Sequence, residues 1–249
     1  MATVHGDEGD MIRFNGSVCA AGRKERVMRT LFVIVLVSMV CAACCHCVVP
    51  KQCCAGSRTP SEFVSLFNGK SFDGWVIMGD PEGWKIQDGI IHSDGGKGGN
   101  WLRSVKEYSD FILTLEWKVS PRGNSGVFVR CTEQGNPWET GHEIQISNEQ
   151  PPRDDLHCTG ALYGTVAVNP RPDESPNRWR TYEIACIGKR ITVKIDGVQC
   201  VDADMDKVPA IKNKPMRGYI GIQDSHTGPG CTIEYRNIRI KELSSDPRM

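Results

Sequence analysis

Short runs of alternating apolar and polar residues fill the chain between residues 62 and 243. In the run FILTLEWKV at 111–119 nearly every second side chain is apolar, so an extended strand would carry these side chains on one face. Gly, Asn, Asp and Pro separate the runs, and no stretch of ten or more residues has a convincing helical apolar period. The pattern predicts an all-β fold of many short antiparallel strands, packed as a two-sheet jelly-roll sandwich.

The clearest strands are predicted at 111–119, 126–130, 143–147, 182–187, 190–195, 219–223 and 232–240. The pair Asp196-Gly197 follows one of them and is typical of a tight turn between neighbouring antiparallel strands. Three long loops are polar or rich in Gly and Pro, at 94–100, 147–158 and 169–177. Loops on a rigid sandwich often carry ligand contacts, so we expect at least one of the three to help form a site; the alternative is permissive surface.

The charge balance argues against two classes of partner. Thirty basic and thirty acidic residues give a formal net charge of zero. No basic field is available to attract nucleic acid or an anionic membrane surface, so we expect neither as a partner.

The twelve cysteines form two groups, apart from a solitary Cys19. Six of them, with His46 among them, crowd into residues 41–54. Structural metal sites usually use two separated pairs, so a metal role for this single cluster is disfavoured. The five others are scattered, which leaves at least one unpaired within a monomer, and buried free thiols are expected for most of them. They are Cys131, Cys158, Cys186, Cys200 and Cys231.

The N-terminal part has the plan of an export signal. Basic residues precede the short apolar run Leu31–Val40, and small residues follow it. A membrane span needs about 20 apolar residues, so this run is short for one. Ala42-Ala43-Cys44 resembles the end of a bacterial lipoprotein box, although Cys41 stands where that box has Leu. We expect a periplasmic or secreted protein or a cell-surface lipoprotein, with an uncleaved anchor as a third alternative and any membrane contact made through this segment.

These observations divide the chain into five parts. Residues 1–27 form an N-terminal extension, with Met28 as an alternative start, and residues 28–45 form the signal peptide or lipoprotein signal. A linker at 46–61, the β-sandwich at 62–243 and a tail at 244–249 complete the chain.

The segment GHEIQIS at 141–147 has the sharpest polar pattern. Strand alternation places Glu143, Gln145 and Ser147 on one face and the two isoleucines on the other. Burying three polar side chains without partners is costly, so this face must meet either solvent or a ligand. It is therefore either a ligand-lined concave surface or an ordinary solvated sheet face.

A second polar run lies at 124–130, with the sequence NSGVFVR. Alternation predicts that Asn124, Phe128 and Arg130 share one face, where an amide and a guanidinium could bind sugar hydroxyls beside an aromatic ring. Gly126 between them would allow close approach of a ligand or a neighbouring strand. Alternatively, Arg130 only pairs with an acidic residue, Glu143 or Glu116.

The candidates for acid–base catalysis are one carboxylate on a predicted strand and one histidine in a loop. A retaining glycosidase needs two carboxylates about 5 Å apart, whereas the polar strand supplies Glu143 alone. His226, in the loop at 223–228, suits proton transfer near neutral pH, although an isolated loop histidine can also be merely solvated. Competing histidines are His92, His142 and His157, and loop acids without a predicted position are Asp154, Asp155 and Asp224.

Several segments, in order, carry a family resemblance over residues 62–243. They are LFNGK at 66–70 with FDGW at 72–75, WKIQDG at 84–89, NSG at 124–126 with Phe128 and Arg130, GHEIQI at 141–146, TGALY at 159–163, NRW at 177–179, DG at 196–197 and RNIRI at 236–240. Together they resemble the 3-keto-disaccharide hydrolase-like family, which is similar in fold to concanavalin A-like lectins and glucanases. Two positions depart from the family pattern: Ser147 replaces an Asp, and Ser225 and Thr227 lengthen the closing Gln-x-His-Gly loop.

The resemblance implies a carbohydrate ligand and a substrate oxidised at C3 of a glycoside. A C3 ketone acidifies the C2 proton, so one base can form an enolate, the C1 leaving group departs, and water adds. We predict Glu143 as the base and His226 as the acid. The predicted substrate-binding residues are Asn124, Phe128, Arg130, Gln145 and Tyr163.

Three alternatives stay open at this point. The sequence requires no cofactor, although a divalent cation held by Glu143 and His226 would be another way to stabilise the enolate. The domain could also bind glycans as a lectin-like module without turnover, because a fold does not determine a function. A scaffold domain of a surface complex is the third class, and the aligned polar residues of two strands argue against it.

Overall fold

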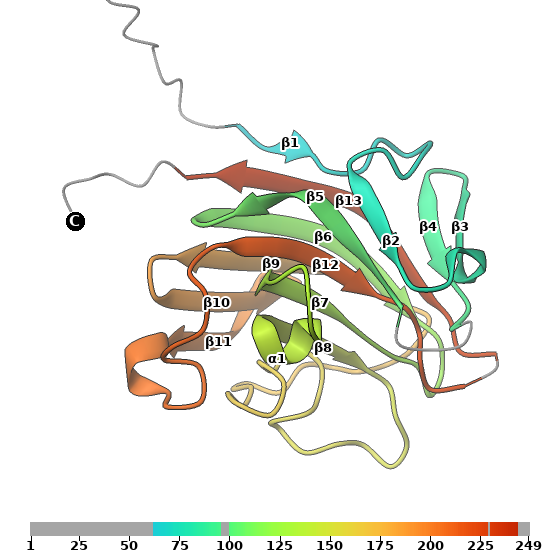
Figure 1. Ribbon diagram of the computed structural model, residues 1–249. Coiled ribbons are helices and arrows are strands. Elements are labelled where there is room, and N and C mark those ends of the chain that lie inside the picture. Colours follow the sequence, from blue (N-terminus) through green and yellow to red (C-terminus); the bar gives the residue numbers. More distant parts are fainter. Residues whose placement is uncertain (1–61, 96–99, 229, 244–249) are drawn as a thin grey trace, which may run out of the picture. The chain divides into compact units, whose positions relative to one another are not determined.

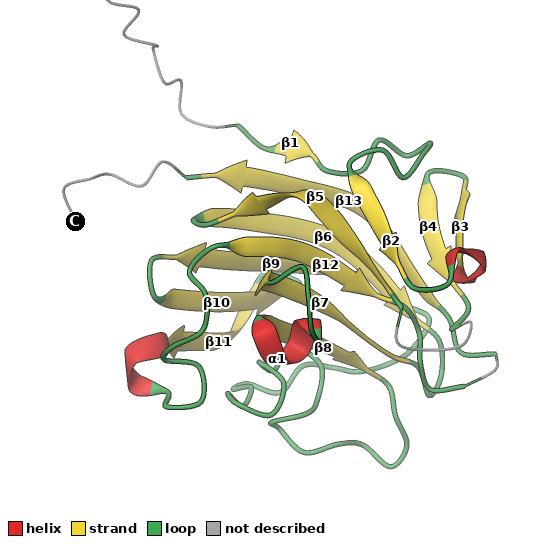
Figure 2. Ribbon diagram, viewed as in Figure 1, coloured by secondary structure: helices red, strands yellow, loops and turns green. Residues whose placement is uncertain are grey.

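Two antiparallel sheets pack face to face in the computed structural model, which describes residues 62–95, 100–228 and 230–243 (Figures 1 and 2). The smaller sheet has the order β2 (Trp75–Met78), β5 (Trp101–Tyr108), β12 (Gly218–Gln223), β7 (Asn124–Cys131) and β8 (His142–Ser147). The larger sheet runs β11 (Val198–Asp204), β10 (Arg190–Ile195), β9 (Arg180–Ile187), β6 (Phe111–Val119), β13 (Ile233–Glu242), β4 (Ile90–Ser93) and β3 (Trp84–Gln87), and β1 (Val64–Ser65) also pairs with β13. Among the residues that the structure describes, helical structure is limited to three single turns, η1 (Pro81–Gly83), α1 (Pro137–Thr140) and η2 (Met205–Lys207).

The all-β sandwich predicted from the sequence is confirmed. Two predicted strands, at 111–119 and 190–195, coincide with β6 and β10, and the other predicted strands each fall on an observed one. Asp196 and Gly197 both have positive φ, 49° and 84°, as the two central residues of a type I′ hairpin turn require. The turn joins β10 to β11, which pair with each other.

The core lies between the two sheets and follows the alternation. In β6 every second residue from Phe111 to Val119 is buried, and the residues between them are partly exposed. In β8, Ile144 and Ile146 are fully buried on the core side. Burial of a large apolar side chain contributes about 1.5–3 kcal/mol, so the alternation also fixes which face of each strand is left for a site.

Two buried tyrosines cross the sandwich from the larger sheet to the smaller one. The Tyr182 hydroxyl on β9 donates to the carbonyl oxygen of Gln145 on β8. The Tyr235 hydroxyl on β13 lies 2.7 Å from Ser125 Oγ on β7 and 3.2 Å from the carbonyl oxygens of Gly126 and Gln223. Both tyrosines are fully buried, so their hydroxyls fix β7, β8 and β12 against the core.

The cysteines of the sandwich behave as small core residues. All five from Cys131 to Cys231 are free and buried, which agrees with the expectation of buried free thiols for most of them. The predicted signal segment, the linker and the N-terminal cysteine cluster lie outside the described residues and stay predictions. Within the described ranges, no helix is long and apolar enough to cross a membrane.

Replacing Tyr235 with Phe should lower the free energy of unfolding by about 1–2 kcal/mol, because the buried Gly126 carbonyl and the Ser125 hydroxyl lose a hydrogen-bond partner, while the Gln223 carbonyl still accepts from Ser125. Urea unfolding measures the difference. The matched control is Tyr219→Phe, which keeps the ring that stacks on Arg103 and should cost less than about 0.5 kcal/mol. Equal stabilities of Tyr235→Phe and the wild type would contradict the bridging role.

Candidate active site

A pocket of about 280 Å³ opens on the outer face of the smaller sheet. Its lining residues are Asn124, Trp138, Glu143, Gln145, Tyr163, Gln223 and His226. Five of the seven residues predicted from the sequence are in this set, and they come from β7, β8 and two loops. Trp138 and Gln223 are additions that the sequence reasoning missed.

A larger hollow of about 500 Å³ lies along β10 and β11, but its charged groups are already paired. Arg190 binds Asp202 at 2.5 Å, and Lys207 lies 3.3 Å from Asp204. Lys189 is bound to Asp206 at 2.6 Å. Each charged side chain that lines this hollow has an oppositely charged partner, so the smaller pocket is the better candidate for chemistry.

The pairing of β7 with β8 creates the floor of the pocket. Gly126 is the register partner of Gln145, and Phe128 that of Glu143. A Cβ atom at Gly126 would lie 2.6 Å from Glu143 Oε1, so the Glu143 side chain folds back over this glycine. Gly126 therefore permits the close approach from the neighbouring strand that its position predicted.

Loop residues 159–166 cover the free edge of β8 and carry Tyr163 to the pocket. Gln145 N donates to the Ala161 carbonyl at 3.1 Å, and Gly160 N donates to the Gln145 carbonyl at 2.8 Å. Tyr163 N donates to the Glu143 carbonyl at 3.0 Å. These backbone bonds hold the Tyr163 side chain next to Glu143.

His226 is held by a loop with anchors on both sides. Its backbone N–H donates to the Asn124 carbonyl at 3.2 Å, and the hydroxyl of the next residue, Thr227, donates to the Arg122 carbonyl at 2.8 Å. Two residues earlier, Asp224 Oδ2 accepts from the backbone N–H and the side-chain amide of Asn100 at 3.2 and 3.1 Å. Burial raises the pKa of Asp224 to about 6, and this carboxyl serves as an anchor of the His226 loop.

A hydrogen-bonded chain along one wall fixes two ligand-facing groups. Glu149 Oε2 accepts from Asn124 Nδ2 and from Arg153 Nη1, each at 2.9 Å. Arg153 Nη2 in turn donates to the Tyr163 hydroxyl at 3.3 Å. A carboxylate can only accept, so the Asn124 amide must point its Nδ2 at Glu149, and the Tyr163 hydroxyl keeps its own proton for a ligand.

The pocket consequently presents both acceptors and donors. Asn124 Oδ1 and Gln223 Oε1 are buried and have no partner among the described residues. Gln145 Oε1 accepts from Ile146 N at 3.0 Å, which leaves its amide N–H groups for a ligand. Unpaired buried polar atoms are costly, so such an arrangement is expected where a ligand completes the bonds.

Glu143 is the one carboxylate among the lining residues, and it is 7% exposed. No hydrogen bond or ion pair to its carboxylate occurs within the part of the chain that the structure describes. Burial raises the pKa of Glu143 to about 8, and the charge of Lys214 opposes this rise. A carboxylate with so high a pKa is a strong base once it is ionised, as proton abstraction from carbon requires.

His226 is exposed to solvent at the pocket rim, while its ring is crowded by protein on the pocket side. This partial loss of water lowers the pKa of His226, the negative charge of Glu149 raises it, and the charge of Arg153 lowers it. The neutral ring therefore predominates near neutral pH, and the protonated ring is a stronger acid than an ordinary histidine.

Two predicted binding residues lie away from the pocket. Phe128 faces the outer side of the sheet but is fully buried, in a T-shaped contact with Trp101 at 5.7 Å between ring centroids. The prediction that Arg130 shares this face is wrong. Arg130 has φ of 54°, at a register shift between β7 and β12, and this bulge turns its side chain away.

Arg130 instead ties two turns of the sandwich together. Its guanidinium donates to the Ser109 carbonyl at 2.7 and 3.0 Å and to the Gly188 carbonyl at 2.8 Å, and it pairs with Asp110 at 3.1 Å. It is fully buried, and neither Glu143 nor Glu116 is its partner.

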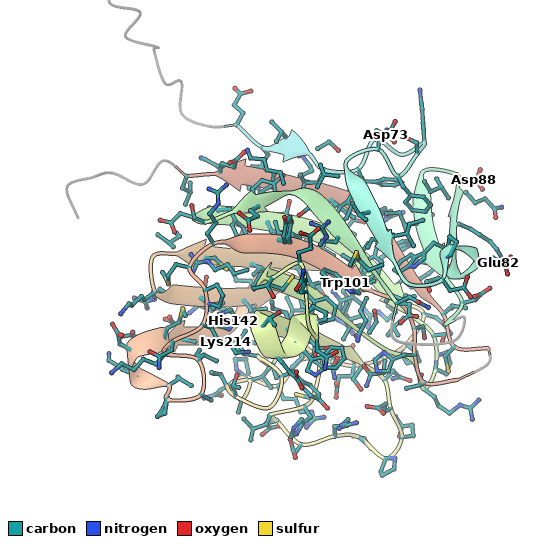
Figure 3. All side chains as sticks on the ribbon, in the orientation of Figure 1. Asp73, Glu82, Asp88, Trp101, His142 and Lys214 are labelled. Atoms are coloured by element: carbon teal, nitrogen blue, oxygen red, sulfur yellow. The ribbon has the colours of Figure 1, made fainter. Side chains whose placement is uncertain are left out.

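The other candidate acids and histidines are engaged elsewhere. Asp154 binds His157 at 2.7 Å, and Asp155 binds Arg171 at 2.9 Å. His92 faces Glu234 at 3.7 Å. His142 is buried beside Lys214 (Figure 3), and burial lowers its pKa to about 3.

The described residues contain no cluster of three His, Cys, Asp or Glu side chains placed to hold a metal ion. Glu143 and His226 line the same pocket, and the divalent cation that they could share stays an open alternative.

Residues 62–241 match the model of the 3-keto-alpha-glucoside-1,2-lyase-like domain family. The chain belongs to this family. A 3-keto-disaccharide hydrolase from Bacteroides thetaiotaomicron is 25% identical over 232 residues, which cover 73% of this chain and 78% of that protein. The family assignment made from the sequence is thereby confirmed, and a carbohydrate-active domain is supported at the level of the family.

Solved structures agree with this assignment. A candidate glycosyl hydrolase from Parabacteroides distasonis is 26% identical, with a TM-score of 0.65 over 74% of this chain and 100% of that one. A second from the same organism is 23% identical, with a TM-score of 0.63 over 73% and 94% of the two chains. A Bacillus subtilis protein with a galectin-like fold, 11% identical with a TM-score of 0.50 over 73% and 94% of the two chains, shares the fold alone.

Replacing Glu143 with Gln should stabilise the protein increasingly as the pH rises. The folded pKa of about 8 exceeds the ordinary 4.5, so the stability that Glu143 contributes is full below pH 4.5 and is lost as the pH rises through 8. Gln resembles the protonated acid and does not ionise, so its advantage should reach about 2–4 kcal/mol by pH 9.

Urea unfolding of both proteins at pH 5 and pH 9 measures this advantage. Glu82→Gln, at an exposed position on η1 (Figure 3), is the control and should show no comparable gain. A pH-independent difference between Glu143→Gln and the wild type would show that Glu143 is not held in its acid form by burial.

Proposed function

We propose that this domain cleaves the glycosidic bond of 3-keto-glycosides by elimination and hydration, with Glu143 as the base. The observation that carries the proposal is a single unpaired carboxylate with a raised pKa in a polar pocket. A mechanism with one base fits this site, whereas hydrolysis with two flanking carboxylates lacks its second acid among the lining residues.

In the first step the ionised Glu143 takes the proton from C2 of the sugar. The electron pair of the broken C–H bond moves into a C2–C3 double bond, and the ketone oxygen at C3 becomes an enolate. The free N–H groups of Gln145 and the hydroxyl proton of Tyr163 are the donors available to stabilise that negative charge.

In the second step the enolate reforms the ketone, a C1–C2 double bond forms, and the bond from C1 to the leaving oxygen breaks. Protonated His226, a strong acid because its pKa is lowered, donates a proton to the departing alkoxide. Water then adds across C1 and C2, with hydroxyl to C1 and a proton to C2, so that the net reaction is hydrolysis.

Substrate recognition is assigned to the remaining lining groups. Sugar hydroxyls both donate and accept, and the pocket offers Asn124 Oδ1 and Gln223 Oε1 as acceptors facing the donors of Gln145 and Tyr163. The family's description as a 3-keto-alpha-glucoside-1,2-lyase-like domain and the name of the Bacteroides relative support this substrate class.

Replacing Glu143 with Gln should lower kcat on a 3-keto-glycoside by roughly 10²–10⁴-fold, because the base is lost while the shape of the side chain is kept. We expect proton abstraction from C2 to be the slow step; it needs the ionised carboxylate but not protonated His226, so kcat of the wild type should rise with pH through about 8. Product release is measured against the same glycoside without the C3 ketone, which should not be cleaved.

A lectin-like module would give a different result in the same assay. Equal glycan affinity of wild type and Glu143→Gln, with no product from either protein, would support binding without turnover. Full turnover by Glu143→Gln would remove Glu143 from the mechanism.

Replacing Gly126 with Ala should lower kcat by roughly 10–100-fold with little loss of stability. The three atoms nearest to the new methyl group all belong to the flexible Glu143 side chain, the first being Oε1 at 2.6 Å, so the methyl group displaces this side chain. The same change in a Glu143→Gln background isolates the cause, because it should then have no further effect. Additive losses in the double variant would place the effect of Gly126 elsewhere.

A further inference from the structure

We propose that Lys214 is a positioning residue of this active site, which fixes the turn that carries Trp138 and sets the charge environment of Glu143. The proposal rests on the proposed function, since it assigns Lys214 a part in the same pocket. Lys214 is not itself a lining residue, and it lies on a loop far away in sequence from α1.

The first observation is the link between Lys214 and the α1 turn (Figure 3). Lys214 Nζ donates to the Trp138 carbonyl oxygen at 3.1 Å and to the Gly141 carbonyl oxygen. These carbonyls lie at the end of a single helical turn, where no further turn exists to satisfy them. One ammonium group therefore closes the end of the turn and holds it against the sandwich.

The second observation is that the Lys214 loop is itself firmly seated. Lys214 N donates to the Ile211 carbonyl at 3.1 Å, and Ile211 N donates to the Val208 carbonyl at 3.0 Å. Ile211 is fully buried in the core. The lysine thus connects the core to the C-terminal end of the short α1 turn.

The residue that this turn presents to the pocket is Trp138. Its side chain lines the pocket, yet the residue is 38% exposed, one of the few large apolar residues left so open. An aromatic ring at the mouth of a polar pocket can stack on the apolar face of a sugar ring. The Trp138 ring can stack on a sugar only if the α1 turn holds it in place, and the hydrogen bonds of Lys214 fix this turn.

The third observation concerns charge. The contact of Lys214 Nζ with the Gly141 carbonyl places the ammonium group only two residues along the chain from Glu143. The positive charge of Lys214 lowers the pKa of Glu143, and the negative charge of Glu143 raises the pKa of Lys214. Burial has the larger effect on both groups: it raises the pKa of Glu143 and lowers that of Lys214. Glu139 on α1 also acts on Lys214, with the same sign as Glu143.

The other elements around Glu143 bring few titratable groups. The loop segments at the pocket contribute Tyr163, His226 and the ion pair of Glu149 with Arg153, and β8 itself carries His142, which is neutral near pH 7. From β12 the pocket receives the neutral Gln223, and from behind β7 the Tyr235 hydroxyl. Arg153 is paired with Glu149, and Lys214 is the cation whose charge favours the ionised form of Glu143.

The test is direct titration of Glu143 by carboxyl ¹³C NMR, with the resonance assigned by its loss in Glu143→Gln. This readout needs no substrate, so it decides the role of Lys214 even if 3-keto-glycosides are not turned over. We expect a titration midpoint near 8 in the wild type and a higher one in Lys214→Met. In Lys214→Arg, which keeps the positive charge, the midpoint should stay close to the wild-type value. Lys212→Met, an exposed lysine of the same loop, is the control and should leave the midpoint unchanged.

A second readout follows Trp138 itself, through its indole ¹⁵N–H signal assigned by Trp138→Phe. In Lys214→Met this signal should broaden or split, and Lys214→Arg should restore it. In the activity assay Trp138→Ala should raise KM roughly threefold to tenfold with little change in kcat, as lost stacking predicts. Lys214→Met should raise KM in the same way and also move the rise of kcat to higher pH.

Two results would overturn the proposal. One is a Lys214→Met protein that is folded, by circular dichroism and thermal unfolding, but keeps the wild-type midpoint of Glu143 and the wild-type signal of Trp138. The other is an equal shift of the midpoint in Lys212→Met, which would reduce the effect to general surface charge. If Lys214→Met does not fold, Lys214→Gln replaces it in the test, because Gln retains a hydrogen-bond donor without the charge. This variant should have a higher Glu143 midpoint and a wild-type Trp138 signal. A wild-type midpoint in Lys214→Gln would refute the charge effect.

Discussion

The register between β7 and β8 is the constraint on which the site depends. It sets Glu143 and Gln145 side by side on the outer face and places Gly126 where the Glu143 side chain must lie. A shift of one residue would send the carboxylate into the core and the isoleucines into solvent, which the burial of Ile144 and Ile146 forbids. The hydroxyls of Tyr182 and Tyr235 then bind these strands from the core side, so the site has a rigid floor.

Function and stability are opposed at Glu143. The residue is almost fully buried and lacks a hydrogen-bonded partner among the described residues, an arrangement that favours the neutral acid and costs free energy when the carboxylate ionises. The same arrangement makes the ionised form a strong base. Glu149, in the wall of the same pocket, has the opposite environment. Its carboxylate accepts hydrogen bonds from Asn124 and Arg153 and serves as a fixed structural anion. The two carboxylates differ in role because one is left without donors and the other is supplied with them.

The sequence predicted the sandwich, the strongest strands and most of the pocket, because alternation in β6, β7 and β8 reports directly which side chains share a face. It failed at Arg130, since alternation assumes a regular pleat and a bulge at positive φ interrupts it. The short strands β2, β3 and β4, of four residues each, left too few alternating positions to stand out. Trp138 and Lys214 could not be foreseen either, because their contact joins segments with no shared pattern; Gln223 alone had a signal, as the first residue of the family's Gln-x-His loop.

The loop at 159–166 has a consequence for how this domain can change. It occupies the backbone groups along the outer edge of β8, and an exposed edge of that kind is a place where chains pair with one another and aggregate. The same loop carries Tyr163 into the pocket. Insertions or deletions that would alter the pocket through this loop would also uncover a strand edge. Changes in substrate preference should therefore be easier at α1 than at the loop that shields β8. The α1 turn only connects β7 to β8, so a change in its length does not uncover the edge of β8.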